Sequence, residues 1–155
     1  MRTQSVLRII DANLNRLAEG LRILEEAARM ALDDVELTQD LKTMRHDLIR
    51  NDITLNIELI QSRDSAGDIG SDLEVSGEEK QKDFPLIIIA NSRRAQESLR
   101  VLEEMAKLPE IASKLDSGKY KKARFELYTI EKKLISRLTQ RKLRQINEKN
   151  DRKPG

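Results

Sequence analysis

The stretch ANLNRLAEGLRILEEAAR (Ala12–Arg29) occurs a second time, in altered form, as ANSRRAQESLRVLEEMAK (Ala90–Lys107). At this shift of 78 residues, 10 of the 18 aligned positions are identical. The apolar residues around the first copy recur at steps of three and four, which is the spacing of one face of an α-helix. They are Ile10, Leu14, Leu17, Leu21, Leu24 and Ala28. The repeat therefore predicts two similar amphipathic helices in one chain.

A weaker match extends each copy of the repeat into a second helix. With one more residue of shift, LKTMRHDL (Leu41–Leu48) aligns with YKKARFEL (Tyr120–Leu127). Each half then predicts one helical hairpin, and neither hairpin can bury its apolar stripe alone. We expect an all-α fold, an antiparallel helical bundle of two duplicated helical hairpins with pseudo-two-fold symmetry and a long loop between the halves.

The expected organisation is a single helical domain over residues 1–146. The repeat halves cover about 5–62 and 84–146, and residues 147–155 form a disordered tail because they contain no apolar side chain. Within the halves, the periodicity and the positions of proline and glycine predict helices over residues 6–32, 37–60, 85–107 and 119–146.

Composition excludes several classes of protein. The 155 residues suit one domain. The absence of cysteine excludes disulfides, iron–sulfur clusters and thiolate zinc sites, and the single histidine, His46, argues against a His-built metal site or triad. The sequence shows neither a leader-like start nor an apolar run of the roughly 18 residues that a membrane span needs. We expect a cytoplasmic chain that does not enter a membrane.

The small net charge hides an asymmetry. Residues 1–118 carry 16 Lys and Arg against 23 Asp and Glu, a net charge of −7, whereas residues 119–155 carry 13 against 4, a net charge of +9. A basic final helix can bind nucleic acid, but it more often forms a solvated face that pairs with acidic neighbours. The nearby aromatic residues Tyr120, Phe125 and Tyr128 recur at helical spacing, which is typical of a core. Nucleic-acid binding is therefore the less favoured interpretation.

The repeated polar residues allow two interpretations. Asn13 and Glu25 flank the apolar stripe on opposite sides, and Asn91 and Glu103 do the same in the second copy. Such boundary positions serve either hydrogen bonds and ion pairs between helices or contacts with a ligand. Arg16 and Arg94 point further outward, toward a neighbouring helix or a ligand.

The loop from Ser62 to Asp83 has no counterpart in the repeat and reads SRDSAGDIGSDLEVSGEEKQKD. Loops of about 20 residues in a compact domain are usually functional or disordered. Arg63, Asp64 and Asp68 combine one cation with two hard oxygen ligands, which suits phosphate and Mg²⁺ chemistry, and Gly67 and Gly70 allow close approach of the backbone to a ligand. The alternative is an acidic linker.

Three segments together resemble a known bacterial family. They are IIDANLNRLAEGLRILEEAAR, LKTMRHDL, and the SRDSAGDIGS loop followed by ANSRRAQESLRVLEE. The set is similar to the all-helical hydroxymethylpyrimidine-phosphate kinase family, which occurs alone or fused ahead of a thiamine-phosphate synthase barrel. The resemblance covers about residues 5–130. Ser65 departs mildly from the threonine expected after the Arg-Asp pair, and the chain contains no barrel.

This resemblance implies phosphorylation of hydroxymethylpyrimidine phosphate by ATP, with Mg²⁺, to give the diphosphate used in thiamine biosynthesis. It implies catalytic roles for Arg63 and Asp64 and metal binding by Asp64 and Asp68. The residues expected to bind substrate or phosphate are Asn13, Arg16, Arg45, Asn91, Arg94 and Gly70. The attacking group is a phosphate oxygen that is largely ionised at neutral pH, so the reaction needs no strong general base.

Two further expectations concern partners. The resemblance implies a functional association with thiamine-phosphate synthase, and the repeat allows either a monomer or a homodimer. The rival class is a non-catalytic helical module for dimerisation or regulation, or a nucleic-acid-binding module that uses residues 119–153.

Overall fold

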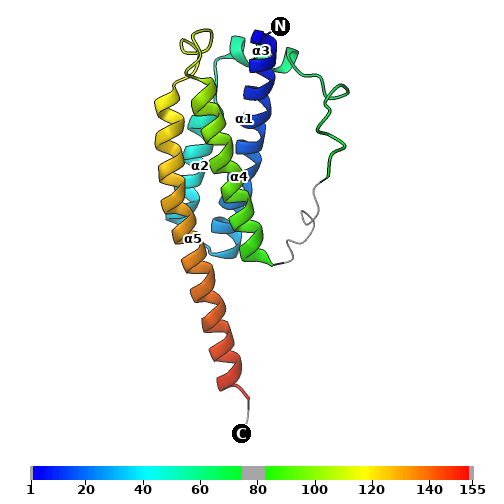
Figure 1. The fold of residues 1–155 in the computed structure, drawn as a ribbon. Helices are drawn as coiled ribbons and strands as arrows, with labels where there is room; N and C mark the ends of the chain where they lie inside the picture. Colours follow the sequence, from blue (N-terminus) through cyan, green and yellow to red (C-terminus); the bar gives the residue numbers. More distant parts are fainter. Residues whose placement is uncertain (1, 75–82, 154–155) are drawn as a thin grey trace.

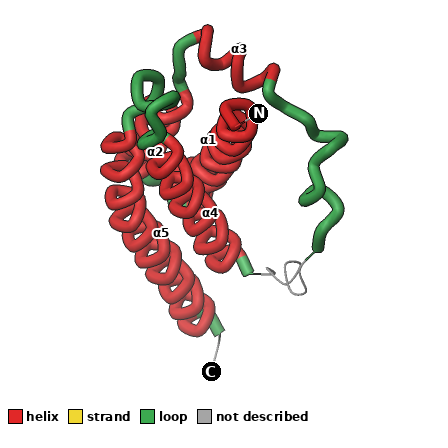
Figure 2. Tube along the Cα trace, turned by 45° about the horizontal axis from the view of Figure 1, so that its top comes forward, coloured by secondary structure: helices red, strands yellow, loops and turns green. Residues whose placement is uncertain are grey.

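The computed structural model describes residues 2–74 and 83–153, and this part of the chain is helical without any strand (Figure 1). The elements are α1 (Arg2–Glu26), a π-helical turn η1 (Ala27–Ala31), α2 (Val35–Ile49), α3 (Ile53–Gln61), α4 (Phe84–Met105) and α5 (Ser117–Asp151). Helix α1 packs against α2 and α4, and α5 packs against α4 and α2. The short helix α3 lies across the N-terminal end of α1 (Figure 2). The all-α prediction is confirmed.

One apolar core holds the long helices together. Every residue of the predicted α1 stripe is buried, and Leu99 and Leu102 of the second copy are fully enclosed. Leu41 and Leu48 from α2 and Leu127 and Leu134 from α5 complete the same cluster. Burial of a leucine side chain stabilises the fold by about 1.5–3 kcal/mol, so these helices depend on each other for stability.

The two repeat helices lie close together at Gly20. A Cβ atom at this position would lie 3.0 Å from the carbonyl oxygen of Asn91 and 3.3 Å from the Cβ of Ala95, both on α4. The obstacle is helix backbone, which cannot move aside as a flexible side chain can. The space between α1 and α4 at this point therefore leaves little room for a side chain larger than that of glycine.

We expect Gly20→Val to lower the free energy of unfolding by about 1–3 kcal/mol, because the new methyl groups force α1 and α4 apart. The measurement is urea unfolding followed by circular dichroism. Glu19→Val is the matched control, since it introduces the same residue one position earlier on an exposed site. Equal stability of the two variants would show that the close approach is unimportant.

The predicted helix over residues 37–60 is wrong in one respect, because the chain forms two helices there. Helix α2 ends at Ile49, and Arg50 adopts an extended conformation with ψ of 104°. Asp52 then caps α3, where its Oδ2 accepts hydrogen bonds from the amides of Thr54 (3.1 Å) and Leu55 (3.4 Å). Asp and Asn favour such caps over helix interiors. The break turns α3 away from α2 and toward α1.

The C-terminal helix also departs from expectation. Helix α5 continues to Asp151, although residues 147–155 were expected to be a disordered tail, and its last turns extend beyond the other helices (Figure 1). Residues 154–155 of the expected tail lie outside the described part. Tyr120 is buried as predicted, but Phe125 and Tyr128 are 54% and 43% exposed, so their helical spacing was wrongly taken for a core pattern.

No helix in residues 2–74 and 83–153 combines the length and the apolarity needed to cross a membrane.

Candidate functional site

The loop that follows α3 is anchored to α1 by an ion pair. The Nε of Arg63 donates to Oδ2 of Asp11 at 2.6 Å, and Nη2 of Arg63 donates to Oδ1 at 3.0 Å. The Asp11 side chain is 12% exposed, whereas the Arg63 side chain is 45% exposed. The hydrogen bonds and charge of Asp11 raise the pKa of the Arg63 guanidinium. This two-point contact fixes the plane of the guanidinium and leaves Nη1 outside the pair.

Beyond Arg63, two aspartate side chains of the loop accept hydrogen bonds from the backbone of the same loop. Oδ1 of Asp64 accepts a hydrogen bond from the Gly67 amide at 3.0 Å, and Oδ1 of Asp68 accepts one from the Gly70 amide at 2.8 Å. The Asp68 contact is an Asx turn, in which the side chain accepts from the backbone two residues further along. A Cβ atom at position 67 would overlap the Asp64 carboxylate, so a larger residue there would force this carboxylate to move. Each aspartate commits one of its two oxygens to the loop.

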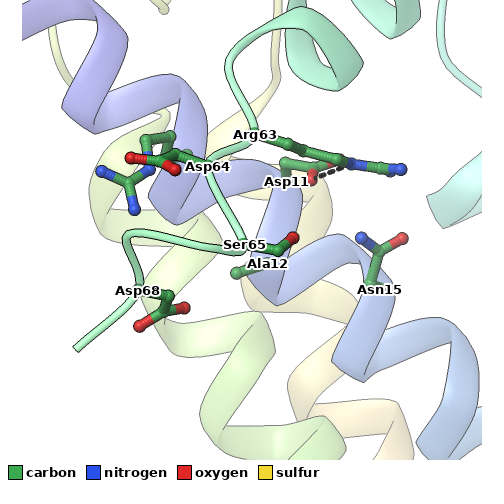
Figure 3. Close-up of a pocket in the computed structure, with 8 residues that line it drawn as sticks. Asp11, Ala12, Asn15, Arg63, Asp64, Ser65 and Asp68 are labelled. Atoms are coloured by element: carbon green, nitrogen blue, oxygen red, sulfur yellow. Dashed lines mark hydrogen bonds and ion pairs between the residues drawn. The ribbon is translucent and has the colours of Figure 1, made fainter. Parts of the chain in front are cut away.

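The loop and α1 line an open cavity of about 290 Å³ (Figure 3). The residues that line it are Arg8, Asp11, Ala12, Asn15, Arg63, Asp64, Ser65 and Asp68. In Figure 3 the Arg63 guanidinium and the Asn15 amide lie on one side, and the Asp64 and Asp68 carboxylates lie on the other, with Ser65 between them. The cavity therefore combines hydrogen-bond donors suited to an anion with hard oxygen ligands suited to a cation.

The donor set fits Mg²⁺ shared with a ligand, and it does not fit a site built by the protein alone. No group of three or more His, Cys, Asp or Glu side chains arranged to hold a metal occurs in the described part of the chain. Mg²⁺ is commonly held by one or two carboxylates together with substrate phosphates and water. Asp64 and Asp68 provide such a pair on one loop.

The polar residues common to both repeats make matching contacts away from this cavity. The Nδ2 of Asn13 donates to the carbonyl of Ile9 at 2.8 Å, and the Nδ2 of Asn91 donates to the carbonyl of Ile87 at the same distance. These contacts are made within a helix and repeat between the halves. They are not the interhelical contacts that the sequence suggested, and the ligand role of both asparagines stays a prediction.

A second repeated contact is a largely buried ion pair. Arg45 of α2 lies 2.9 Å from Glu25 of α1, and Arg124 of α5 lies 3.1 Å from Glu103 of α4. The glutamate side chains are only 8% and 6% exposed. Arg45, expected to bind substrate, is thus engaged with Glu25 at a distance from the loop cavity.

The structure brings together only part of the residue set expected from the sequence. Arg63, Asp64 and Asp68 line one cavity, and Gly70 supports it through its bond to Asp68. Arg16 and Arg94 are exposed and do not line it. His46 is also exposed, 3.6 Å from Asp47, as expected for a surface histidine.

Three residues of α1 that line the cavity were missed by the sequence reasoning. They are Arg8, Asp11 and Asn15, which share one face of the helix. A signal for them exists in the repeat, because at the 78-residue shift their counterparts are Leu86, Ile89 and Arg93. At these three positions the first copy carries polar side chains that line the cavity, whereas the second copy has two apolar residues and an arginine.

Comparison with protein families covers most of the chain. A model of the ThiD2 family matches residues 8–133, from the first cavity arginine to the middle of α5. This chain belongs to the ThiD2 family. The matched part contains the whole cavity and both buried ion pairs.

Curated relatives of this ThiD2 chain are larger proteins. A thiamine-phosphate synthase from Rhodopirellula baltica is 45% identical over 121 residues, which cover 76% of this chain and 32% of that protein. A thiamine-phosphate synthase from Nostoc punctiforme is 40% identical over 134 residues, covering 85% of this chain and 36% of that protein. The chain thus spans about a third of the length of these relatives. No solved structure matches it significantly.

Proposed function

We propose that this ThiD2 domain is a kinase that transfers the γ-phosphoryl group of ATP to hydroxymethylpyrimidine phosphate, in thiamine biosynthesis. The observation that carries the proposal is the loop cavity, where an oriented guanidinium and two carboxylates with hard oxygen ligands face the same space. Phosphoryl transfer between two phosphate-bearing molecules needs this combination of positioning and charge. The two relatives described above are both named thiamine-phosphate synthases, which supplies the metabolic context.

The reaction requires little covalent chemistry from the protein. An oxygen of the acceptor's phosphate attacks the γ-phosphorus of ATP, the bond from that phosphorus to the β–γ bridging oxygen breaks, and ADP leaves with the electron pair. The attacking oxygen is already largely ionised near neutral pH. The absence of histidine from the cavity residues is therefore compatible with catalysis.

We assign Arg63 to stabilise the negative charge on the transferred phosphoryl group. Asp11 holds two of its nitrogens, so the guanidinium is oriented before a ligand arrives, and the remaining edge can donate to phosphate oxygens. Asp64 and Asp68 would hold Mg²⁺ together with the nucleotide phosphates, and the ion would supply positive charge to those phosphates. Ser65 and the loop backbone close the cavity between these two sides.

The repeat has a structural role in this proposal. We assign a pseudo-two-fold relation to the halves, supported by the matching Asn13 and Asn91 contacts and by the paired Glu25–Arg45 and Glu103–Arg124 bridges. The duplicated helices form a rigid frame, and the loop between the halves carries the chemistry. In the longer relatives the same domain would work beside the synthase activity for which they are named.

Ligand-induced thermal stabilisation separates this proposal from the rival classes. A ligand at 100 times its dissociation constant stabilises a folded domain by about 2.7 kcal/mol, which corresponds to about 5–10 °C in melting temperature for a chain of this size. We expect such shifts with hydroxymethylpyrimidine phosphate and with Mg·ATP. A shift with an RNA oligonucleotide alone, lost at moderate salt, would instead support a nucleic-acid-binding module.

A further inference from the structure

The face of α1 that lines the loop cavity differs from the equivalent face of α4. Arg8, Asp11 and Asn15 occupy positions equivalent to Leu86, Ile89 and Arg93, whereas Ala12 has an identical counterpart in Ala90. The three differing residues all line the cavity. The contacts shared by the two copies, in contrast, lie within or between the bundle helices.

From this asymmetry we infer that the described part of the chain has one anion site, where the first repeat copy faces the loop, in which Arg8 and Asn15 bind a phosphate or diphosphate group together with Arg63. The inference rests on the proposed function for the identity of the phosphorylated molecule. It adds two ligand-binding residues and a stoichiometry of one per chain.

The geometry of α1 supports this assignment. Positions 8, 11, 12 and 15 fall on one face of a helix because they are separated by three, one and three residues. Asp11 lies in the middle and is engaged by Arg63, so the two flanking side chains, Arg8 and Asn15, remain to contact a ligand on either side of that pair. In Figure 3 Asn15 lies one turn beyond Asp11, on the same side as the Arg63 guanidinium.

The charges of the cavity predict that anion binding depends on a divalent cation. Asp11 and Arg63 neutralise each other as an ion pair. The remaining charged groups are one cation, Arg8, and two carboxylates, Asp64 and Asp68, which together repel an anion. With Mg²⁺ at the carboxylates the balance becomes positive, and Arg8 can then pair with a phosphate.

Titration calorimetry with inorganic pyrophosphate in the presence of Mg²⁺ tests the inference without any catalytic turnover. We expect one binding event per chain, and about a tenfold or greater loss of affinity in both Arg8→Gln and Asn15→Ala, since hydrogen bonds to charged groups contribute about 1.5–3 kcal/mol. Arg93→Gln is the matched control. It removes the same charge as Arg8→Gln and lies at the repeat position equivalent to Asn15, so its affinity should stay within about twofold of the wild type.

Other outcomes would overturn the inference. Two equivalents bound per chain would show a second site in the other half. Equal losses of pyrophosphate affinity in Arg8→Gln and Arg93→Gln, with no effect of Asn15→Ala, would show that general surface charge attracts the pyrophosphate. Absence of any pyrophosphate binding to the wild type would remove the site. Binding with the expected variant pattern, but without kinase turnover, would leave the anion site standing and reject only the proposed reaction.

Discussion

Asp64→Asn should reduce ATP-dependent phosphorylation of hydroxymethylpyrimidine phosphate by about 10³-fold while leaving the fold unchanged. The substitution is isosteric, and the asparagine oxygen can still accept the hydrogen bond from the Gly67 amide that Asp64 accepts at 3.0 Å. The loop turn therefore survives, but the charge that we assign to Mg²⁺ is lost. The measurement is the steady-state rate of ADP formation, with kcat and KM determined separately.

Two further variants make the test of this prediction more specific. Asp72→Asn removes the same charge from an exposed position in the same loop, outside the cavity, and should change the rate by less than about twofold. Arg63→Ala should reduce the rate of ADP formation by a factor similar to that of Asp64→Asn. An arginine that contacts the transferred phosphoryl group increases the rate of transfer by about 10³-fold or more. Retention of most activity in both Asp64→Asn and Arg63→Ala would refute the assignment of the site.

Arg124→Met should lower the free energy of unfolding by about 3 kcal/mol. Glu103 is buried and relies on Arg124, whose Nη2 donates to it at 3.1 Å, while Arg100 reaches only 3.9 Å. Loss of Arg124 leaves a buried carboxylate without its close partner. It also removes the hydrogen bond to Tyr128 and the contact over the Phe125 ring at 5.0 Å. Urea unfolding at neutral pH gives the value.

The double variant Arg124→Met/Glu103→Leu distinguishes loss of charge pairing from loss of packing. Replacing both partners of a buried ion pair by apolar residues is often close to neutral, so we expect most of the stability to return. Lys122→Met is the surface control, since its contact with Glu126 spans 3.9 Å between exposed side chains and should contribute less than about 0.5 kcal/mol. A loss below 1 kcal/mol in Arg124→Met would show that Glu103 does not depend on it.

The fold could be predicted largely from periodicity. The steps of three and four around Leu17 and Leu21 repeat near Leu99 and Leu102, and these four side chains form the centre of the core. The break between α2 and α3 was missed because Leu48 and Leu55 continue the same stripe across the polar residues at positions 50–52. A gap of seven residues between apolar positions is compatible with one helix or two, and only the capping contacts of Asp52 decide between them.

The loop residues of the site could be predicted from the sequence, but its α1 residues could not. Arg63, Asp64 and Asp68 are close in sequence, so their clustering in one loop is visible without a structure. Arg8, Asp11 and Asn15 lie about 50 residues earlier and meet the loop only because α3 folds back over α1. The ligand roles expected for Asn13, Arg45 and Asn91 stay predictions, because identity between repeats reports common architecture as readily as common chemistry.

The measurement that bears most directly on the central proposal is ³¹P NMR of the wild-type chain with Mg·ATP and hydroxymethylpyrimidine phosphate, beside a sample with EDTA and one with the unphosphorylated alcohol. We predict equimolar ADP and pyrimidine diphosphate, formed only when Mg²⁺ is present. A folded protein that forms no ADP, or that releases ADP and inorganic phosphate without any pyrimidine diphosphate, would contradict the kinase assignment.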